Sequence, residues 1–309
     1  MVRYAILFLV LVCASISAPA HDSPEHVIEL LTARMASAGE RPELLWRRAT
    51  EHRALGNLSA AGRDLRRALR LQSDYLPALT DLGRVRTAQG RHRAALAAID
   101  RAFRFVRDEP GRAPLHMLRA EIYSDVGNME QASRECDLAL CNGSGGELDW
   151  YLTRSQIQCR LGRYADAVAG LRQGYELTGS AVLEVEGIDA MIEAGQYVEA
   201  LQKIEPILQE SRLQSAWLIR RARVRLASGE ITAAQADLAA AIRELNGRLG
   251  TPTPESSLMA ERGLAHALLG DEVLARRDLA AARKLGAEPL LLRRVEQALG
   301  TGRKEKDRG

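Results

Sequence analysis

The sequence lacks an excess of charge of either sign, although more than a quarter of its residues are charged. It has 43 lysine and arginine residues against 40 aspartate and glutamate residues, a formal net charge of +3 over 309 residues. Dedicated nucleic-acid binders concentrate a basic excess on one face, so this balance argues against nucleic acid as a partner. An apolar fraction of 46% argues against a disordered chain and is ample for a core.

The motifs of common catalytic and metal sites are also missing. The six histidines are scattered and form neither an HExxH motif nor a His/Cys cluster, and no G-x-S-x-G sequence or phosphate-binding loop is present. Only His21 and His26, which flank Asp22, could hold a metal adventitiously. We therefore predict no catalytic residue, no cofactor and no metal site. An enzyme with an unrecognised site is the least favoured alternative.

Long hydrophobic runs are absent after Ala20. Residues 4–16 form an apolar run of about 13 residues, shorter than the roughly 18–20 that cross a bilayer. Arg3 precedes this run and Ala18-Pro19-Ala20 follows it, which is typical of a cleavable secretory signal. We predict a cut after Ala20, a secreted, periplasmic location and no membrane insertion after cleavage. An uncleaved anchor is the alternative.

Few cysteines remain once this segment is removed. Cys136, Cys141 and Cys159 have spacings that match neither a CxxC redox motif nor a zinc site. An odd number in an oxidising compartment leaves at least one thiol without an intrachain partner. Two alternatives stay open: all three are buried single thiols, or two of them form a disulfide.

What the sequence does contain is an internal repeat. A glycine followed five residues later by an alanine occurs seven times at intervals of 33 to 41 residues, with the glycines at positions 56, 90, 127, 162, 195, 229 and 270. Apolar residues with a period near 3.6 flank each glycine, as at Leu79 and Leu82 before Gly90 and at Ile99 and Phe103 after it. Each repeat is therefore predicted to be two short helices joined at the glycine. One such pair cannot bury both apolar faces alone, so neighbouring pairs must stack.

This pattern resembles the tetratricopeptide repeat (TPR) family, whose unit is about 34 residues long. Tyr164 and Tyr197 occupy the aromatic position after the glycine, and Ala68-Leu69 matches the Ala-Leu position of the second helix. The first-helix tryptophan is mostly replaced, and the terminal proline is missing. The resemblance implies an all-α, right-handed α-solenoid of about seven helix-turn-helix repeats, which begin at Pro42, Leu76, Ala113, Leu148, Ala181, Ser215 and Ser256.

Capping helices are expected at both ends of this array, which spans residues 42–288. The N-terminal helix lies within residues 21–41, and Ser23 is its predicted N-cap residue. The C-terminal helix spans residues 289–300 and covers the last repeat. Residues 301–309 contain no apolar side chain and are predicted to be a disordered tail.

Two further features concern the joints and one repeat. Residues 142–146 and 247–255 are predicted to form longer joints than the others. In the fifth repeat Gly187 departs from the usual order and Pro206 lies late in the second helix. We therefore expect that repeat to be distorted.

In four repeats an arginine at the seventh position is followed by an acidic residue sixteen positions later. Because the two helices of a repeat are antiparallel, we predict ion pairs that join them rather than groups that face a ligand. The four predicted pairs are Arg48–Asp64, Arg119–Glu135, Arg221–Asp237 and Arg262–Asp278.

In the TPR family, defined first-helix positions line a concave groove that binds partners. Carried onto this sequence, they change from basic to acidic and back to basic along the array. A bound segment should then be basic where it meets the acidic residues and should use Trp46, Met117, Leu152 and Ile219 as apolar anchors. An ordinary solvated helix face is the alternative. The candidate groove comprises Trp46, Arg47, Arg84, Met117, Glu121, Asp125, Asp149, Leu152, Glu186, Asp189, Glu193, Ile219, Arg220 and Arg223.

The resemblance implies a non-enzymatic scaffold that binds a protein or peptide through this groove. An assembly or maturation factor for an envelope complex is the alternative. The partner's identity and the oligomeric state stay open at this point.

Overall fold

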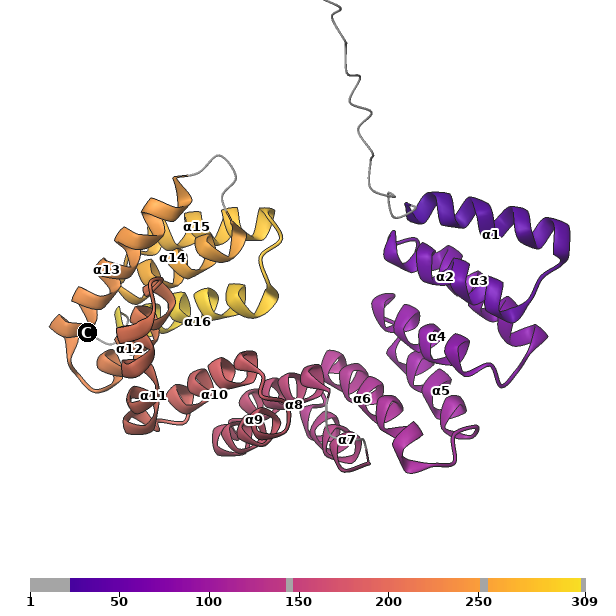
Figure 1. Cartoon of the computed structure of the whole chain (residues 1–309), viewed down its shortest axis with the longest axis horizontal. Helices are drawn as coiled ribbons and strands as arrows, with labels where there is room; N and C mark the ends of the chain where they lie inside the picture. Colours follow the sequence, from indigo (N-terminus) through magenta and orange to yellow (C-terminus); the bar gives the residue numbers. More distant parts are fainter. Residues whose placement is uncertain (1–22, 143–146, 251–254, 307–309) are drawn as a thin grey trace, which may run out of the picture. The chain divides into compact units, whose positions relative to one another are not determined.

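The computed structural model describes residues 23–142, 147–250 and 255–306, and every regular element in these ranges is an α-helix (Figure 1). The chain divides into two compact units, residues 1–143 and residues 144–309. The all-α prediction is therefore confirmed. The predicted signal sequence, the glycine-rich joint at 143–146 and both prolines of the second joint lie outside the described residues.

The N-terminal unit contains one leading helix and three antiparallel helix pairs, each matching one predicted repeat. Ser23 caps the leading helix, because its Oγ accepts a hydrogen bond from the His26 N–H at 3.3 Å. The third pair begins earlier than predicted, because Asp108 caps its first helix by accepting a hydrogen bond from the Gly111 N–H at 2.8 Å. The helices of this unit are α1 (Pro24–Ala38), α2 (Pro42–Ala54), α3 (Leu58–Leu71), α4 (Leu76–Ala88), α5 (His92–Phe103), α6 (Glu109–Val126) and α7 (Met129–Asn142).

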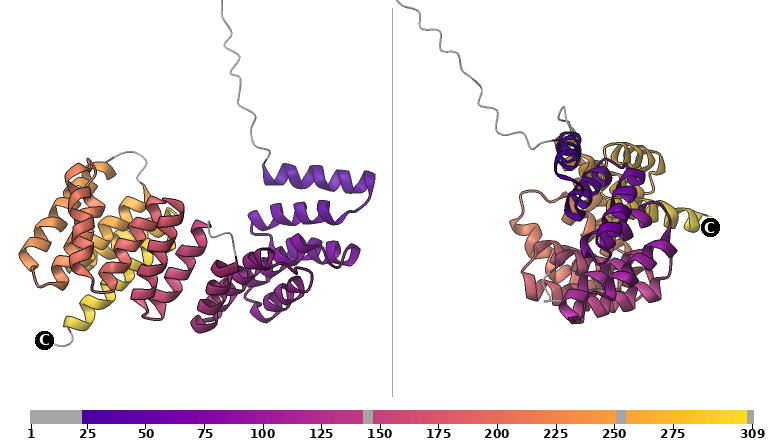
Figure 2. Two further views of the ribbon diagram at one scale, coloured as in Figure 1. Left: turned by 60° about the horizontal axis from the view of Figure 1, so that its bottom comes forward. Right: turned by 90° about the vertical axis from the view of Figure 1, so that its right-hand side faces the viewer.

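The C-terminal unit contains four helix pairs and a final single helix, which packs against α14 and α15 (Figure 2). The helices are α8 (Leu148–Arg160), α9 (Tyr164–Thr178), α10 (Ala181–Glu193), α11 (Tyr197–Glu210), α12 (Ser215–Ala227), α13 (Ile231–Leu249), α14 (Ser256–Leu268), α15 (Glu272–Lys284) and α16 (Pro289–Lys306).

Two boundary predictions in this unit need correction. Helix α16 continues to Lys306, so residues 301–306 are helical rather than a tail. Helix α13 extends to Leu249, which shortens the predicted joint. Helix α11 is continuous through Pro206, which lies in its third turn, but α10 and α11 contact each other less than the two helices of any other pair, in line with the expected distortion of the fifth repeat.

The seven repeat glycines share one conformation and end the first helix of each pair. Their φ angles lie between 70° and 87°, the left-handed region that glycine adopts without a steric penalty. In every repeat the N–H of the residue after the glycine donates to the carbonyl five residues earlier, at 2.8–2.9 Å, as Asn57 does to His52. This is the bonding of a Schellman motif. The glycine is thus required where the chain reverses between two helices.

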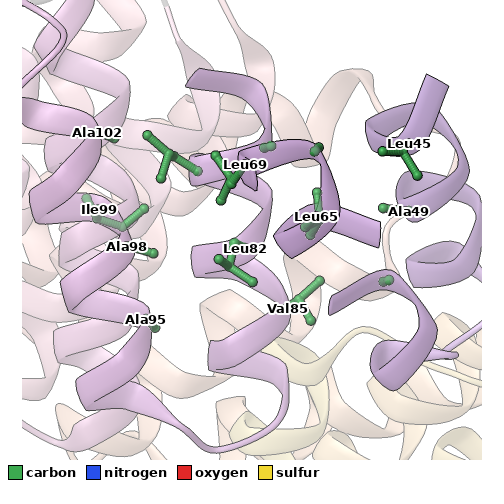
Figure 3. Close-up of a cluster of buried hydrophobic side chains, with 14 of the residues drawn as sticks. Leu45, Ala49, Leu65, Leu69, Leu82, Val85, Ala95, Ala98, Ile99 and Ala102 are labelled. Carbon is green, nitrogen blue, oxygen red and sulfur yellow. The ribbon is translucent and has the colours of Figure 1, made fainter. Parts of the chain in front are cut away.

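The core of the N-terminal unit is built from leucine, isoleucine and many alanines, which let the paired helices approach closely (Figure 3). Leu45, Leu65 and Ile99 are fully buried in it. At the α4–α5 crossing a β-carbon on Gly83 would lie 2.6 Å from Ile99 Cδ1. This close approach explains the small residues that the sequence places at the crossings.

All four predicted arginine–acid pairs are present. The closest nitrogen–oxygen distances are 2.7 Å for Arg48–Asp64, 2.8 Å for Arg119–Glu135, 2.8 Å for Arg221–Asp237 and 2.7 Å for Arg262–Asp278. The acids are buried, and the arginine side chains are 18–23% exposed. A buried carboxylate without its arginine would be unfavourable, so each pair fixes the packing of its two helices.

The same arginines reach a third helix, which the sequence interpretation did not predict. Arg48 also donates to Thr32 on α1 at 2.9 Å, and Arg262 donates to Asn246 on α13 at 2.8 Å. Arg221 pairs with Glu205 on α11 at 3.1 Å in the same way. Each of these partners lies sixteen positions before its arginine. The arginine therefore joins its own pair of helices to the helix that precedes the pair.

None of the three cysteines among the described residues forms a disulfide. Cys136 is buried and Cys159 is half-buried, but Cys141 is exposed, so the expectation of three buried thiols is wrong for Cys141. Within the described ranges no helix combines the length and the hydropathy needed to cross a membrane.

Candidate functional site

In the N-terminal unit two candidate groove residues meet at an aspartate that the sequence interpretation missed. Trp46 on α2 donates its indole N–H to Asp81 Oδ2 at 2.6 Å, and Arg84 donates to Asp81 Oδ1 at 2.9 Å. Asp81 lies on α4 and is 7% exposed, whereas the Arg84 side chain is 48% exposed. The Trp46 ring also packs edge-on against Tyr75. These contacts fix Trp46 and leave Arg84 accessible.

The other candidates in this unit divide into exposed charges and one core residue. Arg47, Glu121 and Asp125 are exposed on α2 and α6. Met117 is only 3% exposed, and its Sδ lies 4.0 Å from Cys136 Sγ on α7. The prediction of Met117 as a groove anchor is therefore wrong, because its side chain packs between the two helices of its own repeat.

In the C-terminal unit the candidate charges gather around one aspartate. Asp189 on α10 is 4% exposed and accepts hydrogen bonds from Arg220 at 2.8 Å and from Arg223 at 2.5 Å, both on α12. Arg294 of α16 reaches the same carboxylate, with its Nη1 3.1 Å from Asp189 Oδ2. Three guanidinium groups thus surround one buried carboxylate.

The neighbouring carboxylates are paired with the same arginines. Glu186 lies 2.9 Å from Arg294, and Glu193 lies 2.6 Å from Arg223. The acidic middle of the predicted groove is therefore neutralised by this chain's own arginines in the C-terminal unit. The expectation that this stretch presents a free acidic surface to a basic partner needs correction here.

The electrostatic consequences differ between the two buried acids. Burial alone would raise the pKa of Asp189, but Arg220, Arg294 and Arg223 together hold it well below its usual range. Glu186 pairs with Arg294, yet burial outweighs this attraction and raises the pKa of Glu186 above the ordinary glutamate value. Asp189 therefore stays ionised at neutral pH, and it holds α10, α12 and α16 together.

A cavity of about 400 Å³ opens beside this cluster. Its walls come from first helices of three successive pairs, α8, α10 and α12, from the start of α9, and from α16. The lining residues are Ser155, Gln156, Cys159, Arg160, Tyr164, Glu186, Asp189, Ala190, Glu193, Arg223, Leu290, Arg293, Arg294 and Gln297. This lining is mostly polar, which suits a hydrated or charged ligand group.

The remaining candidates of this unit lie in different environments. Asp149 is exposed and Leu152 is half-buried on α8. Ile219 is 3% exposed and lines a smaller cavity of about 40 Å³ together with Leu291 of α16. The prediction that Ile219 is an accessible anchor is wrong, because the C-terminal helix packs over this part of α12.

Arg294 is the residue of this cluster that the sequence interpretation missed most completely. It lies 108 positions from Glu186, outside the repeat array, and nothing in the repeat pattern indicates that α16 lies against first helices. The predicted role of α16 as a cover for the last repeat is correct for α14 and α15 but omits its contact with α10.

The cluster shows no arrangement typical of catalysis. Its carboxylates and arginines are bonded to one another, and burial raises the pKa of the Cys159 thiol that lines the same cavity. Among the described residues no group of three histidine, cysteine, aspartate or glutamate side chains is placed to hold a metal ion. This arrangement of charges can bind a polar or charged group.

The sequence matches no protein-family model and no curated protein sequence. The structure is similar to a tetratricopeptide repeat protein from Parabacteroides merdae at 18% identity, with a TM-score of 0.57 over 84% of this chain and 98% of that one. It is also similar to the C-terminal part of a TPR repeat-containing protein from Cytophaga hutchinsonii, at 15% identity and a TM-score of 0.55, over 81% of this chain and 98% of that one.

A third similar structure is the Cut9–Hcn1 hetero-tetramer of the APC/C, at 11% identity and a TM-score of 0.51, over 90% of this chain and 46% of that one. Identities this low establish the fold and not a shared function. The seven helix pairs, their left-handed glycines and these similar structures agree. This protein has the tetratricopeptide repeat fold.

Proposed function

We propose that this protein is a non-enzymatic interaction scaffold that binds a segment of another protein on the first-helix side of its C-terminal unit. The observation that carries the proposal is the cavity of about 400 Å³ between α8, α10, α12 and α16. First helices of consecutive repeats supply three of its walls, and stacked repeats form extended binding surfaces on that side.

The state of the charged side chains supports binding rather than chemistry. Asp189, Arg220 and Arg223 are held in place by one another before any ligand arrives. A preorganised lining lowers the entropic cost of binding a partner. Proton transfer would instead need a group with an open position near the reacting atoms, and Asp189, which is buried and bonded to three arginines, lacks one. That one similar structure, Cut9–Hcn1, is a hetero-tetramer also supports a scaffold role for this fold.

A site-specific photo-crosslinker tests this proposal in the cells that produce the protein. We would introduce it at Gln156, which lines the cavity, and at Arg172, which is exposed on α9 outside the cavity. The scaffold role predicts a discrete protein adduct from position 156 that position 172 does not give. Equal adducts from both positions, or none from position 156, would contradict a partner site in the cavity.

We also propose that the protein acts after export across a membrane. The support is the sequence pattern alone: the apolar run of residues 4–16 followed by Ala18-Pro19-Ala20. Mass spectrometry of the purified protein should find His21 at the N-terminus. An intact Met1 in a membrane fraction would show that the segment is retained as an anchor.

A further inference from the structure

The cavity of the C-terminal unit carries more positive than negative charge. Four arginines line it, against three carboxylates. The adjacent small cavity adds one charge of each sign, Glu261 and Arg220, and Arg220 also binds Asp189. The local field is therefore basic, although the predicted groove was acidic at this place.

The three carboxylates are already neutralised inside the cluster. Each of them is bonded to at least one of Arg220, Arg223 and Arg294, at distances of 2.5–3.1 Å. Asp189 is also largely shielded from water, because its side chain is 5% exposed, and Glu186 is partly shielded, because its side chain is 22% exposed. A ligand that enters the cavity meets their charge already balanced.

Arg293 is an accessible positive charge that the ion pairs of the cluster do not neutralise. It is exposed on α16, next to Arg294, and makes no ion pair with any described residue. Arg160 is also exposed, on α8 at a different wall of the cavity, but it already interacts with another group. Guanidinium groups bind carboxylates with two parallel hydrogen bonds, so the wall that carries Arg293 suits an anionic ligand.

The rest of the lining favours a peptide over a nucleic acid. Gln156 and Gln297 offer side-chain amides that match a peptide backbone, and Leu290 and Ala190 offer apolar contact. Single-stranded nucleic acid is bound by rows of stacking aromatics, and Tyr164 is the only aromatic residue in this described lining.

Resting on the proposed function above, we infer that the cavity binds an acidic peptide segment, with Arg293 receiving a carboxylate of that segment. Arg294 and Asp189 position α16 so that Arg293 faces the cavity. The partner is therefore acidic at the place where the sequence interpretation expected a basic one.

The test uses the full mature chain and two short fluorescein-labelled peptides of equal length. One contains glutamate, leucine and glycine, and the other has lysine in place of every glutamate. Fluorescence anisotropy should show binding of the acidic peptide alone, and the affinity should fall as salt is added. A single-stranded oligonucleotide is the third probe and should bind more weakly than the acidic peptide.

Charge reversal then locates the site. Arg293→Glu should weaken binding of the acidic peptide about tenfold, because it removes an attraction and adds a repulsion. Arg293→Gln should give a smaller loss and provides a second variant if the reversal perturbs folding. Arg277→Glu is the matched control, since Arg277 is an exposed arginine on α15 outside the cavity and the change in net charge is the same.

The outcomes separate the ligand class from the scaffold role. Binding of the basic peptide, tighter binding of the oligonucleotide, or no binding of the acidic peptide would overturn the proposed class. An equal loss in Arg277→Glu and Arg293→Glu would also overturn it, because the attraction would then be general. The adduct from position 156 would still decide whether the cavity is a partner site at all.

Discussion

Among the described residues, each unit of the chain buries one aspartate in a first helix, and the two are held in different ways. Asp81 in the N-terminal unit is bonded to the neutral indole of Trp46 and to Arg84, whose side chain is 48% exposed. Asp189 in the C-terminal unit is bonded to three arginines whose side chains are only 13–16% exposed. Both carboxylates are satisfied, but only the second belongs to a closed cluster of charges.

The difference shows where an ion-pair cluster determines tertiary structure. Around Asp81, water can replace the hydrogen bond from Arg84. The contacts of Asp81 therefore affect only the local packing of α2 against α4. Around Asp189 one charge holds side chains from α12 and from α16. Buried charge is a costly way to stabilise a fold, but it permits one arrangement and penalises others. We infer that the Asp189 cluster places α16 against the first helices and thereby forms the cavity.

Removing the two aspartates gives the largest expected contrast. Asp189→Ala leaves three arginines facing one another out of water and should cost about 3–5 kcal/mol of unfolding free energy. Asp81→Ala leaves an unbonded indole N–H and an arginine that water can reach, and should cost about 1–2 kcal/mol. Urea unfolding measures both, with Trp150 and Trp217 fluorescence reporting on the C-terminal unit. Equal losses would mean that the two sites are equivalent.

The repeated arginine–acid pairs should behave alike in both units, in contrast to the two aspartates. Arg48→Ala and Arg262→Ala each leave a buried aspartate unpaired and remove a hydrogen bond to the helix that precedes the pair. We expect each to lower the unfolding free energy by about 2–3 kcal/mol. The exposed Arg277→Ala is the control, with a change of about 0.5 kcal/mol or less. A large loss of unfolding free energy in one unit alone would show that the pairs do not have the same structural role in both units.

Acid should weaken the C-terminal cluster through Asp189. Its depressed pKa means that its stabilisation is complete above the unfolded aspartate pKa of about 3.9 and is lost as the pH falls below that value. Glu186 acts in the opposite direction, since its raised pKa makes protonation favourable to the folded state. The stability difference between the wild type and Asp189→Asn should therefore be constant above about pH 5 and shrink in acid. A difference that grows in acid would contradict this assignment.

The smallest expected effect concerns the fourth repeat, which has the arginine but not the acid. Arg154 occupies the seventh position, and Gly170 stands sixteen positions later with Arg154 Nη1 2.5 Å from where its β-carbon would be. Because that contact is the end of a flexible side chain, Gly170→Asp should be accommodated. It should stabilise the chain by about 1 kcal/mol through better helix propensity and a new ion pair. Gly170→Ala isolates the propensity, and no difference between the variants would mean that no pair forms.

The sequence predicted the parts of the fold that repeat. Seven glycines at a nearly regular spacing identified the helix pairs, and the constant separation of arginine and acid identified Arg48–Asp64 and its three counterparts. Both signals are periodic, so several weak matches reinforce one another. The end of α16 at Lys306 was missed, because no repeat constrains that region.

The candidate site was predicted only in part, for two physical reasons. Family positions assigned Met117 and Ile219 to the groove, but each meets a neighbour that those positions do not include, Cys136 for the first and the C-terminal helix for the second. The sequence did identify Glu186, Asp189 and Glu193. It predicted a free acidic surface there because the neutralising contact with Arg294 was not foreseen. A contact between side chains so far apart in the sequence leaves no periodic trace in a single chain.

The most direct test of the central claim is a double-mutant cycle between Asp189 and Arg294. Asp189→Asn, Arg294→Met and the double variant would be compared with the wild type by urea unfolding of the C-terminal unit. If this ion pair holds α16 against α10, the coupling energy should be about 1–3 kcal/mol, well above the roughly 0.3–0.5 kcal/mol expected of independent sites. Additive effects of the two substitutions would contradict the claim that the Asp189 cluster positions the C-terminal helix.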